Sequence, residues 1–175
     1  MKLRNINAIH IKWYGPMTLK EVEQNKYRSD YGVYQIYGVH PVYGRNVLLY
    51  IGKSDEQLFS KRFKQHRNLW LNDSLEDGNN TIYVGRLMGE FTPNNEEWSR
   101  NIDIAERLLI YSHSPAYNSD HINSVGEDRV KNFIIFNWGK RGSLLPEVSG
   151  MRMTDKYWEE LDKDVEKLKS FKAEK

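Results

Sequence analysis

The sequence predicts an α/β fold of the α+β kind, in which a mixed or antiparallel sheet packs against helices. Two strand-like runs, at 31–37 and 47–51, are too close together for a parallel crossover. Around them, strand-like and helical patterns follow in the order strand, strand, helix, strand, helix. The length of 175 residues suits one domain.

The first expected elements are a strand and a short helix. Ile9, Ile11 and Trp13 alternate with polar residues, which predicts a half-buried strand. Thr18 and Glu21 have the spacing of a capping box, in which each side chain binds the backbone N–H of the other. A helix is therefore expected to begin at this pair.

Two strands joined by a turn are expected next. The β-branched and aromatic residues of 31–37 favour a strand. Gly, Pro and Asn residues over 38–46 predict the turn. The apolar run at 47–51 predicts a second strand, antiparallel to the first and buried on both faces.

The middle of the chain predicts two helices and a third strand. Ser54 and Gln57 repeat the capping-box spacing, which predicts a helix from there to about Trp70. Residues 81–88 are typical of a strand. A second helix, ended by Ser114-Pro115, carries an apolar stripe formed by Trp98, Ile102, Ala105 and Leu109.

The C-terminal part predicts one more strand and one more helix. Residues 132–138 have the composition of a strand. Thr154 is placed to cap a last helix. The apolar stripe of that helix consists of Trp158, Leu161, Val165 and Leu168.

Composition narrows the class of protein. The chain has no cysteine, which excludes disulfides, zinc–thiolate sites and thiol nucleophiles. There is neither a membrane-spanning apolar run nor a secretory signal, so a cytoplasmic protein is expected. The net charge of +2 says little about a nucleic-acid partner, but residues 61–67 hold four Lys/Arg and no acid.

Several side chains are candidates for chemistry. Arg62 and His66 are four residues apart on one helix face, where two donors suit a phosphate, although a solvated basic face is the simpler interpretation. Glu106, next to core-facing Ala105, suits a divalent cation or a salt bridge. Asn118 suits an Asx-turn, and Lys53 suits a phosphate or solvent.

Several competing signatures are absent. The sequence has no Gly-x4-Gly-Lys-Ser/Thr loop and no His-Glu-x-x-His motif. It has no Gly-x-Ser-x-Gly elbow, and no acid stands two residues before any lysine. P-loop nucleotide chemistry, zincin-type proteolysis and the acid-x-Lys arrangement of many restriction nucleases are thereby excluded.

Six features follow in order along the chain: Gly-Val-Tyr at 32–34, Tyr-Ile-Gly at 50–52, Arg62, His66, Glu106 and Asn118. This ordered set resembles the GIY-YIG nuclease family, and most closely its restriction-endonuclease branch. The resemblance covers roughly 31–118, with Val33 in place of isoleucine. The gap at 35–49 is longer than usual, which we attribute to an extended hairpin around His40–Asn46.

The resemblance implies a small, mainly antiparallel three-stranded sheet flanked by helices. Residues 31–118 would be the nuclease core of a single domain, and 1–30 and 119–175 would be extensions of unknown role. It also implies a metal-dependent DNA endonuclease that hydrolyses phosphodiester bonds with one Mg²⁺ or Mn²⁺. Duplex DNA would be the substrate, and a homodimer is one way to cut both strands.

The resemblance assigns roles to six side chains. Glu106 would bind the metal, and Tyr50 would act near the attacking water as general base, with help to lower its ordinary pKa of about 10. Arg62 would stabilise charge on the scissile phosphate. His66 would hydrogen-bond a phosphate oxygen or Tyr50, Tyr34 would orient water or Tyr50, and Asn118 would brace the site. The expected DNA contacts are Lys53, Lys61, Lys64 and Arg67.

Two other functions remain open from the sequence. One is a catalytically inactive nucleic-acid-binding module on the same fold, for which DNA retardation without cleavage would be diagnostic. The other is a protein-interaction domain that uses the aromatic surface and the C-terminal helix. That function would leave the basic cluster at 61–67 unexplained.

Overall fold

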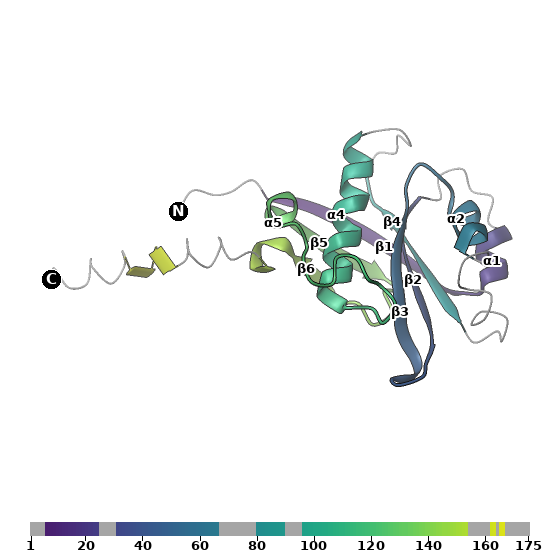
Figure 1. The fold of residues 1–175 in the computed structure, drawn as a ribbon. Helices are drawn as coiled ribbons and strands as arrows, with labels where there is room; N and C mark the ends of the chain where they lie inside the picture. Colours follow the sequence, from purple (N-terminus) through teal and green to yellow (C-terminus); the bar gives the residue numbers. More distant parts are fainter. Residues whose placement is uncertain are drawn as a thin grey trace.

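The computed structural model describes residues 6–24, 31–66, 80–89, 96–153, 162–163 and 165–166. Its strands form one mixed sheet in the order β3-β2-β4-β1-β5-β6 (Figure 1). The strands are β1 (Asn7–Met17), β2 (Gly32–His40), β3 (Gly44–Ser54), β4 (Thr81–Leu87), β5 (Phe133–Gly139) and β6 (Glu147–Ser149). The helices are α1 (Leu19–Gln24), α2 (Phe59–His66), α4 (Glu96–His113), α5 (Glu127–Val130) and the 3-10 helix η2 (Gly150–Met153).

The expected three-stranded sheet is wrong, although the α+β class is correct. Strands β3, β2 and β4 do form an antiparallel unit, but β1 pairs antiparallel with the other edge of β4. Strand β5 then pairs parallel with β1, and β6 pairs antiparallel with β5. The physical reason is that a buried edge of β4 would leave its backbone N–H and C=O groups unsatisfied. The N- and C-terminal segments supply the missing partners.

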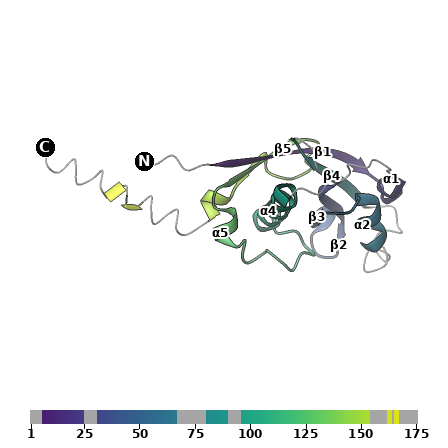
Figure 2. The same cartoon turned by 90° about the horizontal axis from the view of Figure 1, so that it is seen from above.

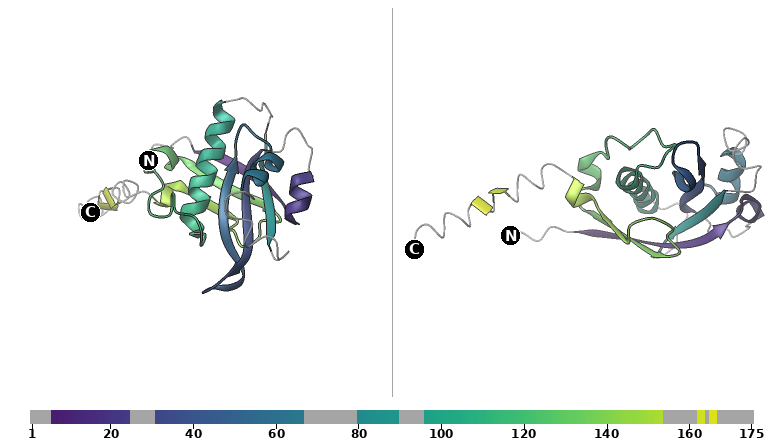
Figure 3. Two further views of the ribbon diagram at one scale, coloured as in Figure 1. Left: turned by 45° about the vertical axis from the view of Figure 1, so that its right-hand side comes forward. Right: turned by 90° about the horizontal axis from the view of Figure 1, so that it is seen from below.

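The sheet curls around α4, the longest described helix. Figure 2 shows α4 inside the curve, between the β1–β5 side and the β2–β3 side of the sheet. The right panel of Figure 3 shows the same arrangement from below, with α1 and α2 at the end of the sheet away from α5. The side chains that α4 buries are Trp98, Ile102, Ile104, Ala105, Leu108, Leu109 and Ile110, which include the whole predicted stripe.

Strand registers divide the core between the two faces of the sheet. On the face toward α4, Ile11 and Trp13 of β1 join one buried cluster with α4 side chains. On the other face, Tyr34 of β2 packs in a second cluster with Phe59 and Phe63 of α2. Successive residues of a strand point to opposite faces, so each strand contributes to both clusters.

Most of the expected local elements are confirmed, and two details are wrong. The Thr18–Glu21 capping box forms, with the Thr18 N–H donating to Glu21 Oε2 at 2.7 Å. The helix expected at Ser54 begins only at Phe59, because Ser54 ends β3 and donates its hydroxyl to the Gln57 carbonyl. Strand β3 is also not buried throughout, because it lies at an edge of the sheet and Tyr50 stays partly exposed.

Some expectations lie outside the described residues. They include the Thr154 cap, most of the last apolar stripe, and the end, at about Trp70, of the helix expected to begin at Ser54. Val165 of that stripe is described; it has helical backbone and is exposed. Within the described ranges, no helix is long and apolar enough to cross a bilayer.

Candidate active site

The two tyrosines of the paired motifs lie on one face of neighbouring strands. Tyr34 pairs with Gly52, and Ile36 pairs with Tyr50, so both phenol rings project from the same side of the β2–β3 ladder. Their ring centroids are 6.1 Å apart. A Cβ on Gly52 would overlap the Tyr34 hydroxyl and lie 2.7 Å from Cε1 of Tyr50. Only glycine leaves room for both rings at this position.

Gly32, the glycine of the first motif, makes its close contact on the other side of β2, where β2 pairs with β4. Gly32 has φ +141° and lies directly against β4, where an added Cβ would collide with the carbonyl oxygen of Gly85. Glycine tolerates this backbone conformation and this approach at little steric cost. The two motifs are therefore similar because two neighbouring strands each need a glycine at a close contact.

Arg62 of α2 reaches the Tyr34 hydroxyl. Tyr34 is fully buried, and Phe59 and Phe63 pack on its ring with centroids 6.2 Å and 4.8 Å away. Burial raises the pKa of Tyr34 strongly, against the effect of a hydrogen bond from Arg62. Tyr34 is therefore a neutral phenol. Nε of Arg62 is buried and has no hydrogen-bond partner within the described part of the chain.

Glu106 of α4 lies beside Lys53, which follows the second motif. Lys53 Nζ is 3.3 Å from Glu106 Oε2 and also forms an ion pair with Asp103, one helical turn earlier. Burial raises the pKa of Glu106, against the lowering effect of the Lys53 ammonium. Burial disfavours the charged Lys53, but its hydrogen bond to Asp103 and the charge of Glu106 raise its pKa overall.

The charges of Glu106 and Arg62 both affect the pKa of the Tyr50 phenol. Burial raises the pKa of Tyr50, and the Glu106 carboxylate raises it further, whereas Arg62 lowers it. These interactions link Tyr50 of β3, Arg62 of α2 and Glu106 of α4 in one electrostatic environment. A phenol in this environment needs an additional positive charge to lose its proton at neutral pH.

Asn118 binds the backbone of β3 along its free edge, the edge that does not pair with β2. It is buried and accepts a hydrogen bond from the Ile51 N–H while its side-chain amide donates to the Ile51 carbonyl, both at 2.9 Å. The Tyr117 N–H also donates to the Leu49 carbonyl at 2.8 Å. This segment pairs with the edge of β3 and fixes the backbone next to Tyr50. The role of Asn118 in a reaction, which the resemblance implies, stays a prediction.

The remaining predicted contacts lie on or beyond α2. Lys61 and Lys64 are exposed on α2. His66 is the last residue of that helix, and its side chain lies outside the described residues, as does all of Arg67. The structure thus places Tyr34 and Tyr50 side by side with Arg62 near them, and pairs Glu106 with Lys53. Glu106 acts on Tyr50 through its charge, and Lys61 and Lys64 lie at the surface.

Asp103 is a charged residue of this site that the sequence analysis missed. Asp103 accepts a hydrogen bond from Arg107 Nε at 2.7 Å in addition to its ion pair with Lys53. Burial opposes ionisation, but the bonds from Arg107 and Lys53 lower the pKa of Asp103 overall. The spacing of Asp103 and Glu106, three residues apart on one helix, was the signal available in the sequence.

The fit of this site to a divalent metal depends on few carboxylates. Within the described residues, no group of three or more His, Cys, Asp or Glu side chains has the geometry to hold a metal ion. Mg²⁺ keeps several waters and needs only one or two carboxylates together with substrate phosphates. Glu106, with Asp103 one turn away, is compatible with that requirement.

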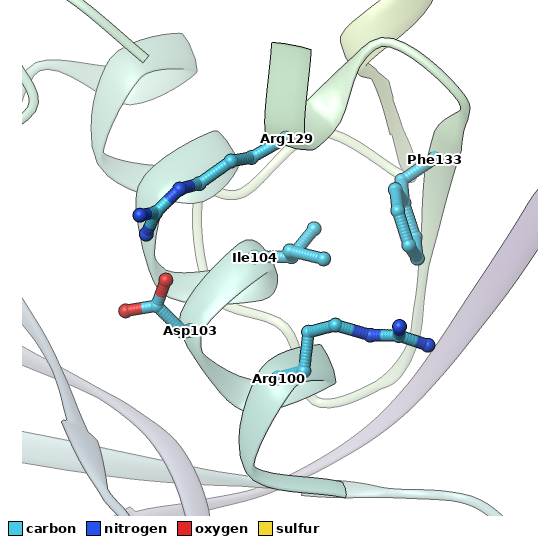
Figure 4. A pocket seen from close by; sticks show the side chains of 5 residues that line it. All are labelled: Arg100, Asp103, Ile104, Arg129 and Phe133. Atoms are coloured by element: carbon cyan, nitrogen blue, oxygen red, sulfur yellow. The ribbon is translucent and has the colours of Figure 1, made fainter. Parts of the chain in front are cut away.

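A separate cavity of about 310 Å³ lies against α4. Figure 4 shows Ile104 projecting into it, and the guanidinium of Arg129 on the same side as the Asp103 carboxylate. The head group of Arg100 points the other way, beneath Phe133. The two arginines therefore do not converge on one point, and the cavity shares only Asp103 with the site described above.

Comparisons with known proteins add no homologue to this geometry. The chain has no significant match to a protein-family model, to a curated protein or to a solved structure. Any functional conclusion must therefore come from the residues and their arrangement.

Proposed function

We propose that this protein is a metal-dependent DNA endonuclease of the GIY-YIG type. The observation that carries the proposal is the shared environment of Tyr50, Arg62 and Glu106, which come from a strand and two different helices. A phenol, a guanidinium and a carboxylate that act on one another electrostatically are the groups that phosphodiester hydrolysis needs as base, charge stabiliser and metal ligand.

Each side chain has a role in the proposed reaction. Glu106 would hold the metal through its carboxylate. Tyr50 would accept the proton of the attacking water after its phenol had lost its own proton to solvent, for which the positive charge of a bound metal would be needed. Arg62, whose Nε has no partner among the described residues, donates to the phosphate as its charge builds up. A bound Mg²⁺ or Mn²⁺ would supply Lewis-acid polarisation and would lower the pKa of nearby water.

The ion pair between Lys53 and Glu106 is compatible with metal binding because Lys53 has a second partner. Asp103 binds the same ammonium, so Glu106 can exchange Lys53 for a metal without leaving the lysine unpaired. Released from Glu106, Lys53 can also face a phosphate of the DNA. Lys61 and Lys64, exposed on α2, extend this positive surface toward the backbone of a duplex.

Plasmid cleavage tests the proposal. We expect the wild-type protein to nick or linearise supercoiled plasmid when Mg²⁺ or Mn²⁺ is added, since Mg²⁺ needs only one or two carboxylates together with substrate phosphates. The variants Glu106→Gln and Tyr50→Phe are nearly isosteric, and we expect each to lower the cleavage rate at least ~100-fold. Tyr43→Phe, at the exposed hairpin tip, is the matched control and should cut normally.

The proposal is wrong if the purified protein cuts no DNA in either metal, or if Glu106→Gln cuts at the wild-type rate. The alternative is an inactive nucleic-acid-binding module on the same fold. The Lys53–Glu106 ion pair favours that alternative, because an ammonium already neutralises the carboxylate. Retarded mobility of DNA without cleavage in any metal would identify this second function.

A further inference from the structure

The outer face of β1 and β5 carries aromatic and basic side chains in register. His10 lies opposite Phe136, and Lys12 lies opposite both Trp138 and Arg86, so the five side chains share one face. On this face α1 reaches the end of β1, where Tyr14 packs against the cluster that includes Val22. Figure 2 and the right panel of Figure 3 show α4 on the opposite face, with no described helix over β5 on this side. Over β5 the face is thus open within the described part of the protein.

His10, Phe136 and Trp138 form what we call the aromatic platform. The rings of His10 and Phe136 stack with centroids 5.1 Å apart and planes 15° apart. The ring of Trp138 is 50% exposed and lies within 29° of parallel to Phe136. Trp138 Nε1 also donates to His10 Nδ1 at 3.1 Å, which fixes the indole. A partner that stacks on Trp138 therefore has little side-chain entropy to remove.

Positive charge lies beside the aromatic platform. Arg86 and Lys12 lie over the ring of Tyr14, at 4.7 Å and 5.6 Å from its centroid. Lys140 is exposed, and its backbone N–H is tied to β1 through the Trp13 carbonyl. The acidic Glu147 pairs with Phe136 on the far side, at β6, so the cations gather on the β1 and β4 side of the rings.

We propose that the aromatic platform and its neighbouring cations bind unpaired nucleotides of a single-stranded nucleic-acid segment. A base offers its face to an aromatic ring only when it is unstacked, so a duplex cannot use Trp138 in this way. The cations Lys12, Arg86 and Lys140 match the phosphates that accompany such bases. Exposed aromatic rings without this charge would fit an apolar partner instead.

The aromatic platform also lies on the same sheet face as the candidate catalytic phenols. Tyr34 pairs with Val84, Val84 pairs with Tyr14, and Tyr14 is two residues from Lys12 on β1. Three strand steps separate β3 from β1, which is about 14 Å along the sheet. As a description of substrate, this inference rests on the proposed nuclease function: the enzyme would hold a DNA that has an unpaired stretch near the cut.

Fluorescence anisotropy in EDTA tests the binding without cleavage. The probes are a labelled single-stranded dT oligonucleotide and a strand of equal length in which every base is replaced by an abasic tetrahydrofuran. Both probes carry the same phosphates, so their difference reports base contacts alone. We expect the dT strand to bind at least ~10-fold more tightly, since each base that stacks on an aromatic ring adds to the free energy of binding. Equal binding of the two strands would overturn the proposal.

Two variants separate stacking from charge. Trp138→Leu keeps apolar bulk but removes the ring, and should weaken dT binding ~10-fold while leaving abasic binding unchanged. Lys12→Gln, on an exposed side chain, should reduce the slope of log affinity against log salt by ~0.7. The matched control Tyr43→Leu removes an exposed ring at the hairpin tip and should change neither probe.

The outcomes separate this inference from the nuclease proposal. Should folded Trp138→Leu bind dT like the wild type while plasmid cleavage persists, the proposed nucleotide binding by the aromatic platform is wrong and the nuclease proposal is retained. In the converse case, dT binding that depends on Trp138 without cleavage in any metal supports the aromatic platform and refutes the nuclease. If Trp138→Leu does not fold, the abasic comparison and the Lys12→Gln salt slope still decide.

Discussion

At the scale of single residues, Gly52 explains the second of the paired motifs. Its missing side chain is what allows Tyr34 and Tyr50 to lie on one face with their ring centroids 6.1 Å apart. The tyrosines carry the candidate chemistry, but the glycine sets their positions. Asn118 completes this arrangement from the other edge of β3 by binding both backbone groups of Ile51.

Replacing Gly52 with alanine should disturb stability and activity together. The added Cβ overlaps the Tyr34 hydroxyl, so overpacking should cost ~1–3 kcal/mol in the free energy of unfolding. Urea unfolding measures this loss. The double variant Gly52→Ala/Tyr34→Ala lacks both Tyr34 atoms that the added Cβ overlaps, the hydroxyl oxygen and the ring carbon Cζ, and its cost should be smaller than the sum of the two single costs. Simple additivity would contradict the steric explanation.

At the scale of elements, His113 joins the end of α4 to the loop between β5 and β6. The Leu145 N–H donates to Nε2 of His113 at 2.9 Å, so the ring proton is on Nδ1, which donates to the Leu109 carbonyl at 2.8 Å. Burial lowers the pKa of His113, against the opposing effect of the Leu109 carbonyl. Protonation of Nε2 would place a donor against the Leu145 N–H.

This contact predicts a loss of stability in mild acid. Because the folded pKa of His113 is below its unfolded value of about 6.5, the unfolded chain binds more protons as the pH falls. The contribution is complete above that value and is lost as the pH falls toward the folded pKa, by at most ~1.4 kcal/mol per pH unit. Urea unfolding at pH 7.5 and 5.5 should show a steeper loss for the wild type than for His113→Gln. Parallel losses would refute this assignment.

At the scale of the whole molecule, β1 connects the antiparallel unit β3-β2-β4 to the C-terminal strands β5 and β6. Trp13 Nε1 on β1 donates to Asn137 Oδ1 on β5 at 2.9 Å, in a buried position. The Asn137 side-chain amide in turn donates to the Leu145 carbonyl at 2.8 Å. One amide thereby ties together segments that are 124 residues apart in the sequence.

Loss of this amide should weaken the whole sheet. Asn137→Leu leaves the Trp13 N–H and the Leu145 carbonyl without their partners, which should cost ~2–6 kcal/mol at ~1–3 kcal/mol per unsatisfied group. Because one sheet contains every described strand, circular dichroism and tryptophan fluorescence should still report one coincident unfolding transition. Two separate transitions would show that the C-terminal strands unfold independently.

The sequence alone determined the local elements and the order of the motifs. Alternation at Ile9–Trp13, the Thr18–Glu21 capping box and the apolar stripe of α4 depend on neighbours within a few residues, and all three are present in the structure. The paired Gly and Tyr motifs likewise placed Tyr34 and Tyr50 on adjacent strands.

Only the tertiary structure decided which distant groups meet. The pairing of β1 with β4 and β5, the ion pairs of Lys53 with Asp103 and Glu106, and the open aromatic face all join residues far apart in the chain. Strand registers and helix orientation set these contacts. They follow from burying both sheet faces and satisfying each strand edge at once, which no local pattern encodes.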